Sequence, residues 1–171
     1  MRKPFATEHP VYYQKYIDLI NSPDIIKELD NQVMDFQELI TDITEEKENY
    51  SYAPGKWTPK EVIGHIIDTE RIMAYRALCF ARKDKASLPG FDENDYVKNA
   101  NFSKRSLNSL AQEFALIRES NIALFKVFDE ETLNEMGIAN GNNVSVRAII
   151  FMIAGHAQHH INVIKSKYLL V

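Results

Sequence analysis

The chain has 171 residues, the length of one ordinary domain and too short for two full-sized ones. Its 20 Lys and Arg against 24 Asp and Glu give a formal charge of −4, so it lacks the basic excess that nucleic-acid binding needs. Hydrophobic residues at 45% and charged residues at 26% exclude a disordered chain. With only six Gly and six Pro, the sequence favours long uninterrupted elements, which indicates helices.

The sequence carries no signal for export or membrane insertion. Its longest apolar stretch, residues 148–155, is far shorter than the roughly 20 residues of a membrane span. The basic residues near the N-terminus are not followed by an apolar stretch. A single cysteine, Cys79, cannot form an internal disulfide and fits a reducing compartment. We therefore expect a cytoplasmic protein with no membrane partner.

The first long helix is predicted to follow an N-terminal extension, residues 1–22. Ser22-Pro23-Asp24 has the composition of a helix start, and the acidic stretch 45–49 ends the element. The apolar residues between them recur at helical spacing and define the predicted buried face: Ile25, Leu29, Val33, Phe36, Ile40 and Ile43.

A second helix is predicted from Thr58 to about Arg82. Thr58 and Glu61 form a capping box, Pro59 occupies the first helical position, and Trp57 is placed to pack against Val62. The face that should turn to the core includes polar members as well as apolar ones: Val62, His65, Ile66, Thr69, Ile72, Arg76 and Phe80.

The rest of the chain supplies a loop and two more helices. Residues 83–102 contain Pro89-Gly90 and an acidic cluster, and we interpret them as an ordered loop long enough to serve as a lid. Helices are predicted from about 106 to 128 and from the capping Ser145 to Lys167, with a turn at 140–142 between them. Four amphipathic helices predict an all-α, single-domain protein over 1–171, an antiparallel four-helix bundle.

Three of the five histidines lie on the predicted apolar faces. His156 and His160 are four residues apart, so they differ by only about 40° around the helix and can point to one place. His159 competes with them, but adjacent helical positions diverge by about 100°, so His159 and His160 should not bind the same ion together. With His65 from the second helix, three neutral imidazoles would suit Zn²⁺ or Ni²⁺, with Fe or Mn as further candidates.

Two known kinds of metal site do not fit these histidines. A zincin needs Glu directly after the first His of the pair, and here that residue is Ala157. A ferritin-like di-iron site needs Glu-x-x-His, and the residues three before the histidines are Val62, Ile153 and Ala157. A hydrogen-bonded core histidine remains the alternative to a ligand at each position.

Three segments together resemble the DinB family, which includes the YfiT-like proteins. They read APGKWTPKEVIGHIIDTERIMAYRALCFAR from Ala53, LPGFDENDYV from Leu88, and VSVRAIIFMIAGHAQHHINVIKSKYL near the end. The resemblance spans nearly the whole chain and implies a four-helix bundle, often dimeric, that holds a divalent metal through three histidines. Carried over by motif, those ligands are His65, His156 and His160.

The resemblance implies two activities. Some relatives are S-transferases that activate a low-molecular-weight thiol, and others are described as hydrolases. A bound metal that lowers the pKa of a thiol or a water serves either reaction. The alternative is a non-catalytic, stress-associated bundle with a structural metal or a small-ligand role. We expect a small-molecule substrate and a homodimer, and no nucleic-acid partner.

Other polar residues have a functional and a plain interpretation. Arg76 lies on the His65 face and would either pair with a carboxylate for structure, the favoured interpretation, or anchor an anionic substrate. Asp68, three residues after His65, would accept a hydrogen bond from a ligand imidazole or simply lie in solvent. Asp92, Glu93 and Asp95 would contact substrate or be solvated. Cys79 is expected to be a small core residue.

Overall fold

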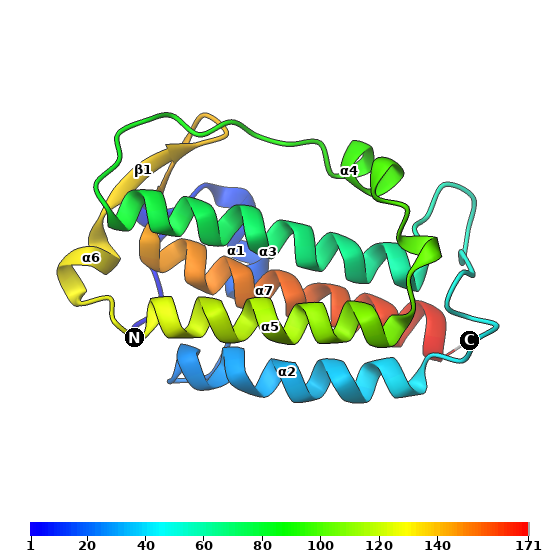
Figure 1. Cartoon of the computed structure of the whole chain (residues 1–171). Helices are drawn as coiled ribbons and strands as arrows, with labels where there is room; N and C mark the ends of the chain where they lie inside the picture. Colours follow the sequence, from blue (N-terminus) through cyan, green and yellow to red (C-terminus); the bar gives the residue numbers. More distant parts are fainter. Residues whose placement is uncertain (171) are drawn as a thin grey trace.

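The computed structural model describes residues 1–170, and its centre is a bundle of four long helices lying side by side (Figure 1). These are α2 (Ile25–Asp42), α3 (Pro59–Ala81), α5 (Leu107–Phe125) and α7 (Val146–Ile164). Helix α3 packs on α5 and α7, and α2 packs on the same two helices. The predicted four-helix bundle is confirmed. Among the described residues, no helix combines the length and apolar character that a membrane crossing needs.

The colours of Figure 1 give the direction of each helix. Neighbours α3 and α7 run antiparallel, as do α2 and α5, whereas α3 and α5 run in the same direction. The parallel pair arises because the connection after α3 travels back along the whole bundle before α5 begins (Figure 1). This connection, residues 83–102, covers one side of α3 and brings some of its own residues to the middle of the bundle.

The predicted helix starts are found as hydrogen-bonded caps. The Thr58 hydroxyl accepts from the Glu61 backbone N–H while Glu61 accepts from the Thr58 N–H, which is the full capping box. The side chains of Asp24, Ser106 and Ser145 accept backbone hydrogen bonds in the same way at the starts of α2, α5 and α7. These caps satisfy N–H groups that a helix leaves unpaired.

The predicted loop 83–102 is wrong in part, because it contains a helix. Asp92 accepts from the backbone N–H groups of Asn94 and Asp95 and so begins α4 (Glu93–Ala100). The other short elements are η1 (Ala6–Glu8), η2 (Val11–Tyr13), α1 (Gln14–Ile17), η3 (Phe102–Lys104), α6 (Glu130–Asn134) and the π-helical η4 (Lys165–Leu169). Acidic residues in the first turn of α4 favour the helix electrostatically.

A small hairpin was not expected from the sequence. Strands β1 (Met136–Ala139) and β2 (Asn142–Ser145) pair antiparallel, and the predicted turn joins them with positive φ at Asn140 and Gly141. The connection after α3 is tied to this hairpin, because the Leu88 N–H donates to the Ile138 carbonyl at 2.9 Å and the Asn140 N–H to the Leu88 carbonyl at 3.0 Å.

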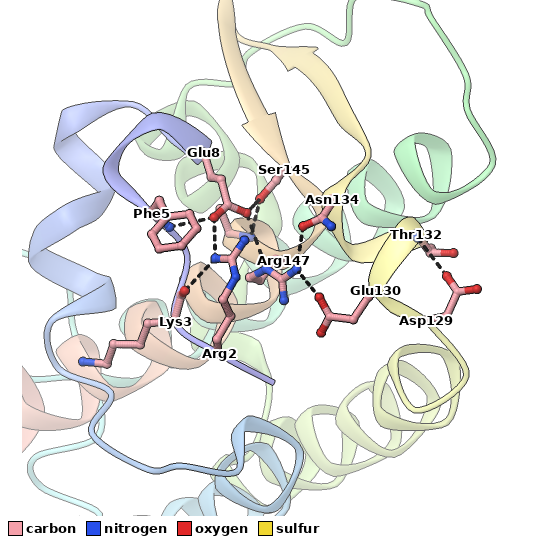
Figure 2. A network of polar contacts seen from close by, with 11 residues as sticks. Arg2, Lys3, Phe5, Glu8, Asp129, Glu130, Thr132, Asn134, Ser145 and Arg147 are labelled. Carbon is pink, nitrogen blue, oxygen red and sulfur yellow. Dashed lines mark hydrogen bonds and ion pairs between the residues drawn. The ribbon is translucent and has the colours of Figure 1, made fainter.

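The N-terminal extension is packed on the bundle. Tyr13, Ile17 and Ile20 are buried, and α1 contacts α7. Figure 2 shows how the segment is held: Glu8 lies beside the start of α7, accepts from the Ser145 hydroxyl at 3.1 Å and pairs with Arg147 at 3.4 Å. Arg147 is fully buried and also pairs with Glu130 at 2.8 Å. These contacts fix the segment to the start of α7.

The core has two apolar halves with a polar layer between them. Along α3, one cluster ends at Ile67 and the other begins at Met73. Because α7 runs in the opposite direction, the second cluster ends there at Ala154 and the first begins at Ala157. The buried polar residues at this level are His65, Thr69, Glu70, His156, Gln32, Arg118 and Asn121. A layer of this kind places polar chemistry in the interior of the bundle.

Candidate metal centre

The three predicted histidines meet in the polar layer. His65 comes from the first half of α3, and His156 and His160 come from successive turns of α7, which packs directly on α3. One ring nitrogen from each lies within 4.8 Å of the others. Among residues 1–170, this group holds three histidines and no cysteine or carboxylate. The sequence prediction that these side chains converge is therefore found in the structure.

The Nε2 atoms of His65 and His156 lie 3.0 Å apart. Two imidazole nitrogens bound to one tetrahedral zinc ion would be about 3.3 Å apart, from Zn–N bonds of about 2.0–2.1 Å. The other ring nitrogen of His65, Nδ1, lies 3.5 Å from the Thr69 hydroxyl. Trp57 packs beside the His65 ring at 4.8 Å between centroids, so the imidazole is held on two sides.

Burial keeps all three imidazoles in the neutral form that binds metals. It lowers the pKa of His65 to about 4 and that of His160 to about 3. The pKa of the fully enclosed His156 is lowered well below its usual value, first by burial and then by the neighbouring His160 and His65. Neutral imidazole offers a lone pair at one nitrogen, the ligand form required for Zn²⁺ and similar ions.

The donor set also leaves an unsatisfied atom that fits a metal site. His160 Nδ1 is buried and has no hydrogen-bond partner within residues 1–170. Buried polar atoms without partners are rare and call for an explanation such as an ion. Three neutral imidazoles with one orphaned nitrogen fit a borderline transition-metal ion, with coordination positions left for other ligands.

Two cavities open onto the histidines. A cavity of about 220 Å³ is lined by His65, His156 and Arg76. Its other lining residues come from the N-terminal segment (Tyr12, Tyr13, Tyr16), the 83–102 connection (Gly90, Phe91, Glu93), α3 (Thr69, Met73), the hairpin turn (Asn140) and α7 (Met152). We call it the arginine cavity. A cavity of about 250 Å³, the aromatic cavity, reaches His160 and is lined by Tyr52, Gly55, Lys56, Trp57, Val62, Asn94, Val163 and Tyr168.

Comparison with known families bears on this site. Residues 28–164 match the model of the DinB superfamily, which is most of the chain and includes all three histidines. The chain belongs to the DinB superfamily.

Individual DinB relatives are distant. A protein of Oceanobacillus iheyensis, provisionally named a metal-dependent hydrolase, is 21% identical over 141 residues, which cover 82% of this chain and 81% of that protein. YfiT from Bacillus subtilis, described as a probable metal-dependent hydrolase with an unusual four-helix bundle topology, superposes with a TM-score of 0.75 at 14% identity, covering 96% of this chain and 90% of YfiT.

A third protein, similar in fold, has a different named activity. The mycothiol-dependent maleylpyruvate isomerase superposes with a TM-score of 0.66 at 11% identity, covering 85% of this chain and 61% of the isomerase. At these identities the superpositions show a shared fold. The DinB fold is thus used by proteins named for hydrolysis and by one named for a thiol-dependent isomerisation.

His159 does not join the histidine group of this DinB protein. It is half-buried, and its ring lies edge-on to Tyr16 at 5.3 Å between centroids. The Tyr16 ring also lies 5.6 Å from His156. The helical offset argument therefore separates His159 from the candidate ligands as expected.

The favoured structural interpretation of Arg76 is wrong. Its guanidinium is buried but pairs with no carboxylate of residues 1–170; it donates to the Pro89 carbonyl at 2.7 Å and to Met73 Sδ at 3.6 Å. It faces the arginine cavity and lies 6.0 Å from the Phe91 ring centroid.

Asp68 does not support a ligand imidazole. It borders a separate hollow with Asp95 and Tyr96, where burial raises the pKa of its carboxyl, and the polar neighbour of His65 is Thr69 instead. Of the acidic residues 92–95, only Glu93 lines the arginine cavity. Cys79 is partly buried against the apolar core, as predicted.

A buried network beside the site was missed. Arg118 on α5 pairs with Glu70 on α3 through two hydrogen bonds of 2.8 Å and donates to Gln32 on α2 at 2.8 Å. Gln32 in turn donates to the Ala154 carbonyl on α7 at 3.0 Å. Gln32 is therefore buried. The sequence pattern predicted burial of the neighbouring Val33 instead, but Val33 is only half-buried. The network thereby links all four long helices, and its contact on α7, at Ala154, lies two residues before His156.

The glycines before two of the ligands permit close contacts. A Cβ at Gly155 would lie 2.1 Å from the Tyr16 backbone oxygen, so only glycine lets the N-terminal segment rest on α7 here. A Cβ at Gly64 would lie 2.4 Å from the Phe102 ring. The partners in these close contacts are α1 and η3, and neither is one of the long helices of the bundle.

Proposed function

We propose that this DinB protein is a metal-dependent enzyme that makes a nucleophile available at His65, His156 and His160. The supporting observation is that three neutral imidazoles converge without a fourth protein ligand in the group among residues 1–170, with His65 and His156 lining one cavity and His160 another. Catalytic metal sites keep such a coordination position open, whereas structural ones close it. Zn²⁺ or Ni²⁺ suits the donors best, with Fe or Mn as alternatives.

The metal, when bound, would supply Lewis-acid chemistry that lowers the pKa of a thiol or a water to near neutrality. The three imidazoles hold and orient it, since their burial keeps them unprotonated. Trp57 fixes the His65 ring, and Tyr16 covers His156. Tyr16 and Trp57 also belong to the walls of the two cavities and would limit water at the reacting atoms.

Transfer of a low-molecular-weight thiol to an electrophile is the reaction we favour. A transfer needs room for two molecules, and the linings of the two cavities differ in charge: one holds the Arg76 guanidinium together with the Glu93 carboxylate, and the other holds Lys56 and no acidic residue. In such a transfer the thiol loses its proton, sulfur bonds to an electrophilic carbon, and the leaving group departs with the bonding electrons. Hydrolysis is the second candidate, favoured by the names of two relatives.

A screen separates these reactions. Protein loaded with Zn²⁺ or Ni²⁺ is incubated with an aryl halide acceptor and, in turn, bacillithiol, mycothiol, glutathione or cysteine, and product is measured by mass spectrometry. We expect a thioether product with one or more thiols, lost in His160→Ala and retained in His159→Ala. Turnover of ester or amide probes without any thiol product would favour hydrolysis, and turnover in neither assay would contradict an enzymatic role.

A further inference from the structure

The structure describes three arginines with side chains in the interior, and they are not alike. Arg118 and Arg147 are fully buried and each pairs with carboxylates, Arg118 with Glu70 and Arg147 with Glu8 and Glu130. Arg76 is only 4% exposed, yet no carboxylate of residues 1–170 lies within ion-pair distance of it. Burial of a charge without a counter-charge is costly, so Arg76 is the exception that needs a reason.

The environment of Arg76 leaves part of its hydrogen-bonding capacity unused. A guanidinium has five N–H donors in a planar fork. Here one goes to the Pro89 carbonyl and one to the weak acceptor Sδ of Met73. The Tyr13 hydroxyl, which donates to the same Sδ at 3.7 Å, also contacts the guanidinium. The remaining donors belong to a side chain that lines the arginine cavity. Such a fork matches the geometry of a carboxylate or phosphate.

The charges around the cavity select between those anions. Arg76 is the only Lys or Arg among the residues that line it, and Glu93 adds a negative charge. With Arg76 and Glu93 both charged, a bound carboxylate would leave a net charge of −1 in the confined site and a doubly charged phosphate ester −2, so the singly charged carboxylate meets less repulsion. The lining is otherwise largely aromatic and thioether, from Tyr13, Phe91 and Met73 among others, which suits an apolar body behind the anionic group.

The position of Arg76 sets the shape of the ligand. Its Cα lies eleven residues after that of His65 on the same helix, about 16 Å along the axis at 1.5 Å per residue, and its guanidinium reaches back one turn to Met73. Both residues line the arginine cavity. A molecule that reaches from one to the other is therefore elongated, with its charged end remote from the histidines.

We infer that Arg76 binds the carboxylate of an elongated, partly apolar organic acid in the arginine cavity, so that this anion takes the place of the missing protein counter-charge. The reactive end of the molecule would then lie at the histidines, a step that rests on the proposed function. The carboxylate contact itself does not depend on catalysis. Arg76 is thereby a specificity-determining residue at the far end of the site from the metal ligands.

The test is a binding measurement on metal-free protein, which removes direct binding of the carboxylate to an ion. Isothermal titration calorimetry compares 4-phenylbutyrate with the neutral 4-phenylbutyramide on chelator-treated wild type. Charge-assisted hydrogen bonds predict that the wild type prefers the carboxylate by roughly ten- to a hundred-fold. Arg76→Met should abolish this preference, and Arg76→Lys should retain part of it because the charge remains.

Arg71→Met is the matched control. Arg71 lies on the same helix, but its side chain is 49% exposed and pairs with Glu113 outside the arginine cavity. Its removal should leave the preference unchanged. Equal affinity of wild type for the acid and the amide would overturn the inference whether or not Arg76→Met folds, and so would an unchanged preference in a folded Arg76→Met. Neither result depends on turnover, so failure here and failure of the proposed reaction are told apart.

Discussion

The Nε2 atoms of His65 and His156 lie 3.0 Å apart although the two residues are separated by 91 positions in the chain. Two buried, uncharged imidazoles facing each other would make one hydrogen bond at most, and His160 joins them with a buried Nδ1 that has no partner in residues 1–170. This arrangement is better suited to sharing an ion than to stabilising an apolar core. It relates the packing of α3 on α7 directly to the proposed chemistry.

For the metal-free protein we predict that stability falls as the pH drops from about 6.5 towards 4. Burial lowers the pKa of His65 to about 4 and of His160 to about 3, whereas a histidine in an unfolded chain has a pKa of about 6.5. The unfolded state therefore binds more protons in this window, which costs up to about 1.4 kcal/mol per pH unit for each histidine. Urea unfolding at pH 7, 6 and 5 measures the slope.

A His160→Gln variant provides the comparison for that slope. It removes one titrating group from the site, so its metal-free stability should depend less steeply on pH than that of the wild type. Identical slopes in the two proteins would show that His160 is protonated equally in the folded and unfolded states, which would contradict the lowered pKa of its buried imidazole.

Metal removal is predicted to leave the fold intact. The two apolar clusters on either side of the polar layer contain aliphatic and aromatic residues from all four long helices, and they provide a core without an ion. Far-ultraviolet circular dichroism before and after excess chelator should differ little in helical signal. Collapse of that signal on chelation would instead assign the ion a structural role, as in small zinc domains.

Glu70→Ala is predicted to destabilise the protein by about 3–5 kcal/mol, because it leaves the buried Arg118 guanidinium without its counter-charge. The control is Arg71→Ala on the same helix, which breaks an exposed pair with Glu113 and should cost no more than about 1 kcal/mol. Chemical denaturation measures both. Similar losses in the two variants would mean that the buried network contributes little.

Gly155→Ala is predicted to lower stability by about 1–3 kcal/mol, because the new methyl group would lie 2.1 Å from the Tyr16 backbone oxygen. The backbone there must move, and the N-terminal segment would move with it. Gly64→Ala meets the Phe102 side chain, which yields more easily than backbone, and should cost less. Thermal unfolding ranks the two variants, and a Gly155→Ala protein as stable as wild type would refute the close contact.

The sequence was informative wherever one helix determined the answer. Thr58 and Glu61 lie three residues apart and cap their own helix, so the start of α3 needed no tertiary information. His156 and His160 share a face of α7 for the same reason, and the helix geometry excluded His159. A buried face could be predicted for His65, and the family resemblance supplied its pairing with α7.

The remainder depends on contacts that no local pattern encodes. The contact of Tyr16 with Gly155 brings together segments more than a hundred residues apart, and the buried Tyr13 donates to Met73, 60 positions away. In the sequence, nothing distinguishes Arg118 from other charged helix residues, because its partners Glu70 and Gln32 lie on other helices. The absence of a carboxylate of residues 1–170 beside Arg76, on which the inference about the substrate rests, is likewise a property of the packed molecule.

Metal stoichiometry of purified variants tests the proposed three-histidine site most directly. Wild type and the alanine variants at positions 65, 156, 159 and 160 are loaded with Zn²⁺ or Ni²⁺, dialysed and analysed by mass spectrometry for bound metal. We predict about one ion per chain in wild type and His159→Ala, and stoichiometric binding lost in His65→Ala, His156→Ala and His160→Ala. Retention of metal by His160→Ala together with its loss from His159→Ala would contradict this assignment of the ligands.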